Sequence, residues 1–179
     1  MKLNIHTTHD RGFTLIETLI AIAVLMIAIA GPLTIANKAL VTALYAKNQS
    51  VATYLALEEM ELLKNTKDVT VYNTPSGTVD PLAWLNGFSS SCINSGQKCD
   101  LSIAAGYSIK TACPTNGCQL YITADGYDHT GTQTTPFSRY FYLTQIAPDD
   151  YQATVIVTWN EGTVSNAVTL NSEIVNAIR

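Results

Sequence analysis

Residues 13–33 read FTLIETLIAIAVLMIAIAGPL, an apolar run that starts abruptly after a short polar leader. At about 1.5 Å of rise per residue, a helix of this length spans roughly 31 Å, which matches the thickness of a bilayer core. Residues 19–30 contain no polar side chain. The run therefore predicts one helix that crosses a membrane.

Glu17 is the single charged residue in this run. An ionised carboxylate at the bilayer centre costs on the order of 3 kcal/mol, and less at the depth of Glu17, about 6 Å inside the edge. A cut between Gly12 and Phe13 would create an α-amino group, and a neighbouring subunit could bring its own amine against Glu17. The alternative is a carboxylate that snorkels to the membrane interface and has no partner.

A secretory signal peptide is a competing interpretation, because residues 28–30, Ala-Ile-Ala, offer a cleavage site of small residues. The abrupt start of the apolar run, its internal carboxylate and the helical pattern that follows it weigh against that interpretation. Lys2 and Arg11 precede the run. The positive-inside tendency therefore predicts a leader in the cytoplasm and the bulk of the chain outside.

Residues 11–17, RGFTLIE, resemble the class III signal of type IV prepilins and type II secretion pseudopilins. The resemblance implies that prepilin peptidase cuts after Gly12 and that Phe13 is then N-methylated. It also implies that Glu17 pairs with a neighbour's Phe13 amine during assembly. The implied partners are other pilin or pseudopilin subunits, the peptidase, an inner-membrane assembly platform and, before assembly, membrane lipid. The implied location is the bacterial cytoplasmic membrane, then an extracellular or periplasmic filament.

Gly31 and Pro32 depart from the pattern of many pilins, whose helix-breaking proline lies at a slightly different place in the span. Proline removes an amide donor and clashes with the preceding turn, so a kink or local melting is expected near residues 28–32. Such a kink could be a bending point in a filament core. It could equally be a kink of the kind that any membrane helix tolerates.

Residues 35–64 contain no Gly or Pro, and their apolar positions recur at helical spacings. These positions are Leu40, Leu44, Val51, Leu55, Leu62 and Leu63. The pattern predicts an amphipathic helix over residues 35–67 that continues the membrane helix. Its far end holds Glu58, Glu59, Glu61, Lys64 and Lys67, which we interpret as a solvated face and not as a catalytic carboxylate pair. Residues 49–61 are similar to the helix of PilV-type minor pilins and of the minor pseudopilin I, which implies a minor subunit.

Residues 68–179 predict a polar head. Residues 68–105 are broken by Gly and Pro and predict loops, whereas period-two runs predict strands at 107–110, 120–123, 139–146, 151–159 and 164–170. The last three strands should form an antiparallel meander, with Val155, Val157 and Trp159 on the face that the helix covers. The expected fold is α+β, with a leader at 1–12, a membrane or filament-core helix at 13–34, the amphipathic helix at 35–67 and an extracellular head.

Four cysteines, Cys92, Cys99, Cys113 and Cys118, lie in this head. An extracellular compartment favours disulfides, and local spacing favours Cys92–Cys99 and Cys113–Cys118 among the three possible pairings. A zinc site with the same four ligands is the alternative. No cofactor is expected.

Candidate chemistry in the head is sparse. With the leader removed, His129 is the one histidine, and it lies in a segment predicted to be a loop. Oxygen ligands there, chiefly Asp125 and Asp128, could hold calcium, although turn formation explains the same residues. The net charge is −4 and no run of Lys or Arg follows the leader, so no nucleic-acid site is evident. We therefore expect a structural subunit; the alternatives are a signal-anchored extracellular binding module that does not polymerise and an anchored enzyme.

Overall fold

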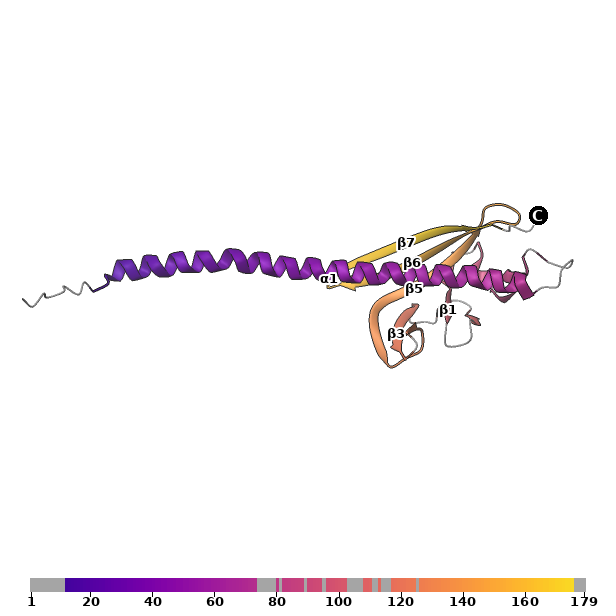
Figure 1. Cartoon of the computed structure of the whole chain (residues 1–179), viewed down its shortest axis with the longest axis horizontal. Helices are drawn as coiled ribbons and strands as arrows, with labels where there is room; N and C mark the ends of the chain where they lie inside the picture. The colour runs from indigo at the N-terminus through magenta and orange to yellow at the C-terminus, as the bar shows by residue number, and fades with distance from the viewer. Residues whose placement is uncertain are drawn as a thin grey trace, which may run out of the picture. The chain divides into compact units, whose positions relative to one another are not determined.

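The computed structural model (Figure 1) describes residues 12–73, 80, 82–88, 90–94, 96–102, 108–110, 113, 117–124 and 126–175. The chain divides into two units, Met1–Leu44 and Tyr45–Arg179. Most of the expected leader lies outside the described residues.

One helix, α1, runs from Leu15 to Asn73. The sequence predicted its end at residue 67, but the helix continues to Asn73. Alanine and leucine are its most frequent residues, and both lose little side-chain freedom in a helix.

The first unit holds the apolar part of α1. Every described side chain in residues 12–44 is exposed, and the apolar ones include Phe13, Leu19 and Leu25 at 79%, 60% and 60% of their full area. By length and composition, α1 is able to cross a membrane. An apolar surface of this size must be covered by lipid or by other protein.

The second unit contains a five-stranded antiparallel sheet with the order β4-β3-β5-β6-β7. Its strands are β3 (Gln119–Thr123), β4 (Gly126–Asp128), β5 (Gln133–Gln145), β6 (Tyr151–Glu161) and β7 (Val164–Ile174). The predicted meander is confirmed, because β5, β6 and β7 pair in order through short turns. Gly162 has φ +61 in the turn between β6 and β7, a conformation that glycine adopts without strain.

The second half of α1 covers one face of this sheet, as Figure 1 shows within the unit. The helix buries Ala52, Leu55, Ala56, Glu59, Met60 and Leu63. From the sheet, Val155, Val157 and Trp159 lie at 0–2% exposure on the covered face, while Ile156 and Thr158 are half-buried on the other. The predicted α+β fold, a long helix on an antiparallel sheet, is thereby confirmed.

Short elements connect α1 to the sheet. They are the 3-10 helices η1 (Ala83–Gly87) and η2 (Ser90–Cys92), and a small hairpin of β1 (Asp100–Ser102) and β2 (Ser108–Lys110). Disulfides join Cys92 to Cys99 and Cys113 to Cys118, which are the pairings that local spacing favoured. Ile93 and Cys99 bridge to Leu143 and Phe141, so this segment is attached to the edge of β5 that β6 leaves open.

Two strands were not predicted. β1 lies in a stretch that the sequence assigned to loops, and β4 lies in the segment around His129 that also reads as a loop. Both contain residues typical of turns, Asp100 and Ser102 in β1 and Gly126 and Asp128 in β4, which favour a loop in the sequence. Gly131, after β4, is required by close packing, since a Cβ there would lie 2.7 Å from the Cβ of Tyr121.

Candidate functional site

The N-terminal candidate site lies where the described chain begins. Gly12, Phe13 and Thr14 are not helical, and α1 starts at Leu15. Glu17 is exposed in the first turn, where its amide donates a hydrogen bond to the Thr14 carbonyl oxygen at 3.1 Å. The free amides at a helix start favour a nearby carboxylate by a few tenths to about 1 kcal/mol. The position therefore suits a negative charge, and Gly12 and Phe13 before it are exposed.

Gly31 and Pro32 lie inside α1, and the helix is continuous through both. Since Pro32 has no N–H, the carbonyl of Ala28 loses its usual helical donor. The Thr34 hydroxyl donates to the Ala30 carbonyl oxygen at 2.9 Å. Local melting is not seen here, and the kink expected at this point stays a prediction.

A buried ionic cluster is the main polar feature of the head. Arg139 on β5 is fully buried, and its Nε lies 3.2 Å from an Oε of Glu59 and 3.2 Å from an Oδ of Asp100. Its Nη1 lies 3.2 Å from Glu58, whose side chain is 34% exposed. Arg139 therefore joins carboxylates from α1 and from β1 around one guanidinium. Burying a charge is tolerated only with such partners.

Each carboxylate has a further role in the packing. The Leu101 amide donates to Glu59 Oε1 at 3.1 Å, which joins the start of the small hairpin to α1. His129 Nε2 contacts the second oxygen of Asp100, and the other ring nitrogen lies 3.0 Å from the Gln119 carbonyl oxygen. The cluster thus connects α1, β1, β5 and the segment after β4.

Burial dominates the electrostatics of this cluster. Removal from water raises the pKa of Glu59 from 4.5 to about 7, although the charge of Arg139 opposes the shift. Burial and the neighbouring Glu59 raise the pKa of Asp100 well above its ordinary value. Burial lowers the pKa of Arg139, but the surrounding carboxylates outweigh that effect and raise it above its ordinary value. The guanidinium therefore stays charged while the two buried carboxyls compete for a proton.

The cluster corrects one interpretation of the sequence. Glu59 was expected on a solvated face with Glu58, Glu61, Lys64 and Lys67, but it is fully buried, and Glu58 is partly buried. A signal was present, because Glu59 lies four residues from Leu55 and from Leu63 on the buried stripe. Arg139 was missed in the same way, at an inward position of β5 between Phe137 and Phe141.

The proposed calcium ligands are only partly visible. Asp125 lies outside the described residues, while Asp128 is buried and its Oδ1 accepts a hydrogen bond from the His129 amide at 2.7 Å. Among the described residues, no group of three or more His, Cys, Asp or Glu side chains is arranged to hold a metal ion. The four cysteines are joined in disulfides, so the alternative of a zinc site with these ligands is not supported.

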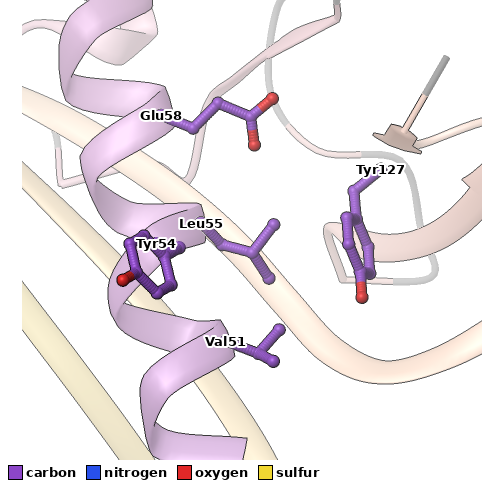
Figure 2. Close-up of a pocket in the computed structure, with 5 residues that line it drawn as sticks. All are labelled: Val51, Tyr54, Leu55, Glu58 and Tyr127. Atoms are coloured by element: carbon purple, nitrogen blue, oxygen red, sulfur yellow. The ribbon is translucent and has the colours of Figure 1, made fainter.

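A shallow groove lies beside the cluster, with a volume of about 380 Å³. Its lining residues are Val51, Tyr54, Leu55, Glu58 and Tyr127. In Figure 2, Val51, Leu55 and Glu58 point from α1 toward Tyr127. The one carboxylate is already paired with Arg139, and no nucleophile with a neighbouring base lines the groove. The arrangement fits a surface recess better than a catalytic centre.

Replacing the buried cation tests the cluster. We expect Arg139→Met to lower the free energy of unfolding by about 3–5 kcal/mol, because Glu59 and Asp100 lose their counter-charge inside the protein. Trp84 and Trp159 are buried in the head. Urea titration of the full chain in detergent, followed by tryptophan fluorescence, therefore measures the change. Lys98→Met removes an exposed cation over the Tyr140 ring and should change stability by less than about 1 kcal/mol. Equal losses in the two variants would contradict the assignment.

The raised pKa of Glu59 predicts a pH dependence. A carboxyl that is harder to ionise in the folded state stabilises the protein below pH 4.5, and this contribution is lost as the pH rises through about 7. Asp100 contributes with the same sign, and Arg139, Glu58 and His129 are the other groups that face the pair.

The urea midpoint should therefore fall as the pH is raised from about 5 to about 8. The fall should be smaller in Glu59→Gln, whose amide oxygen can still accept from Leu101. Glu61→Gln changes an exposed carboxylate on the same helix and should keep the wild-type slope. Identical slopes in wild type and Glu59→Gln would show that Glu59 does not titrate in this range.

Comparison with known proteins identifies the N-terminal segment. Residues 7–31 match the prokaryotic N-terminal methylation motif, which covers Gly12, Phe13 and Glu17. No curated protein and no solved structure matches the chain. The protein therefore carries the processing signal typical of type IV pilin and pseudopilin precursors, on a long apolar helix that continues into an α+β head.

Proposed function

We propose that this chain is the precursor of a minor structural subunit of a type IV pilus or a type II secretion pseudopilus. Prepilin peptidase removes residues 1–12 by hydrolysis, and a methyl group is then transferred from a methyl donor such as S-adenosylmethionine to the new amine of Phe13. The helix then holds the subunit in the cytoplasmic membrane with its head outside. An inner-membrane assembly platform transfers it into a filament, where it packs through residues 13–34 and the start of the amphipathic segment.

One observation carries this proposal: an exposed apolar helix begins at a methylation motif and holds a single carboxylate in its first turn. The side chains of residues 13–33 are all exposed, and Glu17 is the one charge among them. Lipid can cover the apolar surface of one copy. Lateral packing with other copies covers the same surface in a filament, so the helix suits both states.

Glu17 gives the assembly its polarity. After cleavage, the Phe13 amine is a cation at the start of the helix, and it repels the amide groups there. The Glu17 carboxylate of a neighbouring copy can neutralise this amine when the two helices are displaced along the filament axis. In a medium of low dielectric constant, such a pair is stronger than in water. Each incoming subunit therefore finds one depth at which its charge is compensated.

The head supports a structural role. Its buried polar groups hold α1 to the sheet, and its groove offers no catalytic arrangement in the residues described. The minor-subunit assignment depends on the likeness of residues 49–61 to PilV-type pilins and to the minor pseudopilin I. A signal-anchored extracellular binding module would use the same head but would never need Glu17.

Cleavage is tested first at Gly12. When membranes containing the chain are incubated with prepilin peptidase and a methyl donor such as S-adenosylmethionine, the mass should fall by that of residues 1–12 less the CH2 gained on methylation, and the new N-terminus should be a methylated Phe13. Without the donor, the mass should fall by that of residues 1–12 alone. Gly12→Val should keep the leader, because a β-branched side chain blocks close approach of the backbone to the protease.

Gly31→Ala is the matched glycine control. A Cβ at Gly31 meets no atom within 4 Å, so this variant should be processed like wild type. A wild-type chain that retains Met1 in the presence of active peptidase would refute the proposal.

Assembly is tested at Glu17. Glu17→Leu should be cleaved normally but should reach the sheared filament fraction about tenfold less than wild type or worse, since its neighbour's amine is left unpaired in a low-dielectric core. Glu61→Leu removes an exposed carboxylate of the same helix and should be incorporated normally. Normal incorporation of Glu17→Leu would exclude charge pairing as the assembly device. Absence of wild-type chain from filaments would favour the anchored binding module.

A further inference from the structure

The free edge of the sheet is unusual in this head. β7 spans Val164 to Ile174 at the end of the strand order, and all its residues pair regularly with β6 without a bulge. No described strand pairs with its other edge. Natural sheets protect exposed edges with Lys, Pro, bulges or very short strands. β7 contains no Lys, Arg or Pro, and Glu173 is its one charge.

The other strand edges of this sheet are covered or short. Ile93 and Cys99 bridge to the edge of β5 that faces away from β6. β4, at the opposite end of the sheet, has only three residues. If the β7 edge of one copy paired with the β4 edge of the next, most of β7 would have no partner strand. Head-to-tail pairing between copies is therefore disfavoured.

The sequence of β7 is complementary to β7 of a second copy in an antiparallel pair. When two copies run antiparallel with Thr169 on the two-fold axis, the opposed residues match in polarity at every pair except Ala167 with Asn171. The opposed pairs are Val164 with Ile174, Ser165 with Glu173, Asn166 with Ser172, Ala167 with Asn171, Val168 with Leu170, and Thr169 with its own copy. Directly opposed residues share a face of the sheet, and pairs of this kind stabilise it.

Charge and burial agree with this register. Glu173 opposes Ser165, so the two copies of Glu173 lie at opposite ends of the pair and do not repel each other at close range. Val168 and Leu170 are half-buried at the rim of the core, and a neighbouring strand would cover the remainder of both side chains. Their counterparts in the second copy are Leu170 and Val168, which makes the apolar contact symmetric.

We propose that β7 is a self-pairing edge, through which two heads join their five-stranded sheets into one continuous sheet. The pair has two-fold symmetry, whereas neighbours within a filament are related by a screw operation. The pairing is thus a second interaction, separate from helix assembly. In an assembled filament it would join heads of two filaments side by side.

Register-specific disulfide formation tests the proposal on the full chain in detergent. All four native cysteines are in disulfides, so an introduced cysteine is the one free thiol. Thr169→Cys places the two thiols opposite each other on the axis and should give a covalent dimer on mild oxidation. Ala167→Cys displaces the thiols by four residues, roughly 14 Å, and should give none. The double variant Ala167→Cys with Asn171→Cys should restore the dimer.

A charge variant provides a second readout that does not depend on thiol chemistry. Thr169→Lys sets two lysines against each other on the axis and should abolish the dimer in sedimentation. Thr158→Lys changes a half-buried position on an interior strand and should leave the dimer intact if the head remains folded, as reported by Trp159 fluorescence. Failure of Thr169→Cys to cross-link, or equal cross-linking of Thr169→Cys and Ala167→Cys, would overturn the proposal. Neither result would affect cleavage or incorporation.

Discussion

The head depends on one buried cation. Arg139 is completely enclosed, and its counter-charges come from α1 and from the start of the small hairpin. Buried ion pairs often add little net stability compared with an apolar packing of the same volume, but an unpaired buried charge is very costly. If α1 slid by one turn along the sheet, Leu55 or Leu63 would replace Glu59 beside Arg139. The cluster therefore selects one position of the helix on the sheet, where apolar packing alone would tolerate several.

This selection matters because α1 serves two different surroundings. Up to Leu44 its side chains are exposed, whereas from Ala52 to Leu63 one stripe is buried against the sheet. An apolar stripe that runs along the whole helix does not determine which part of the helix packs against the sheet. Glu59 determines that position, because it must lie beside Arg139. The Cys92–Cys99 disulfide helps to hold the short elements that bring Asp100 to the same guanidinium. Helix, hairpin and sheet are thus registered to one another by charge.

Much of the fold followed from periodicity in the sequence. The apolar run at residues 13–33, the alternation at Val155 and Val157, and the breaks at Gly and Pro were enough to predict one long helix on an antiparallel meander. The ionic cluster was not predicted, because its members are far apart in the chain and each looks ordinary alone. Glu59 was grouped with its solvated neighbours, and Arg139 was identified only as the first residue of a predicted strand. The sequence could have indicated the pair only in one way: Glu59 lies on the apolar stripe of the helix, and Arg139 lies on the apolar face of a strand.

The N-terminus and the head have to satisfy physical conditions of different kinds. In the proposed function, Gly12, Phe13 and Glu17 must satisfy a protease, a lipid phase and a neighbouring helix with the same few side chains, so few sequences serve. Most conditions on the head are internal, and the proposed pairing of β7 adds one at its edge. Arg139 needs carboxylates within reach but not at fixed positions in the chain, and the sheet needs alternation but no particular residues. Many unrelated sequences satisfy those conditions, whereas few satisfy the conditions set on Gly12, Phe13 and Glu17.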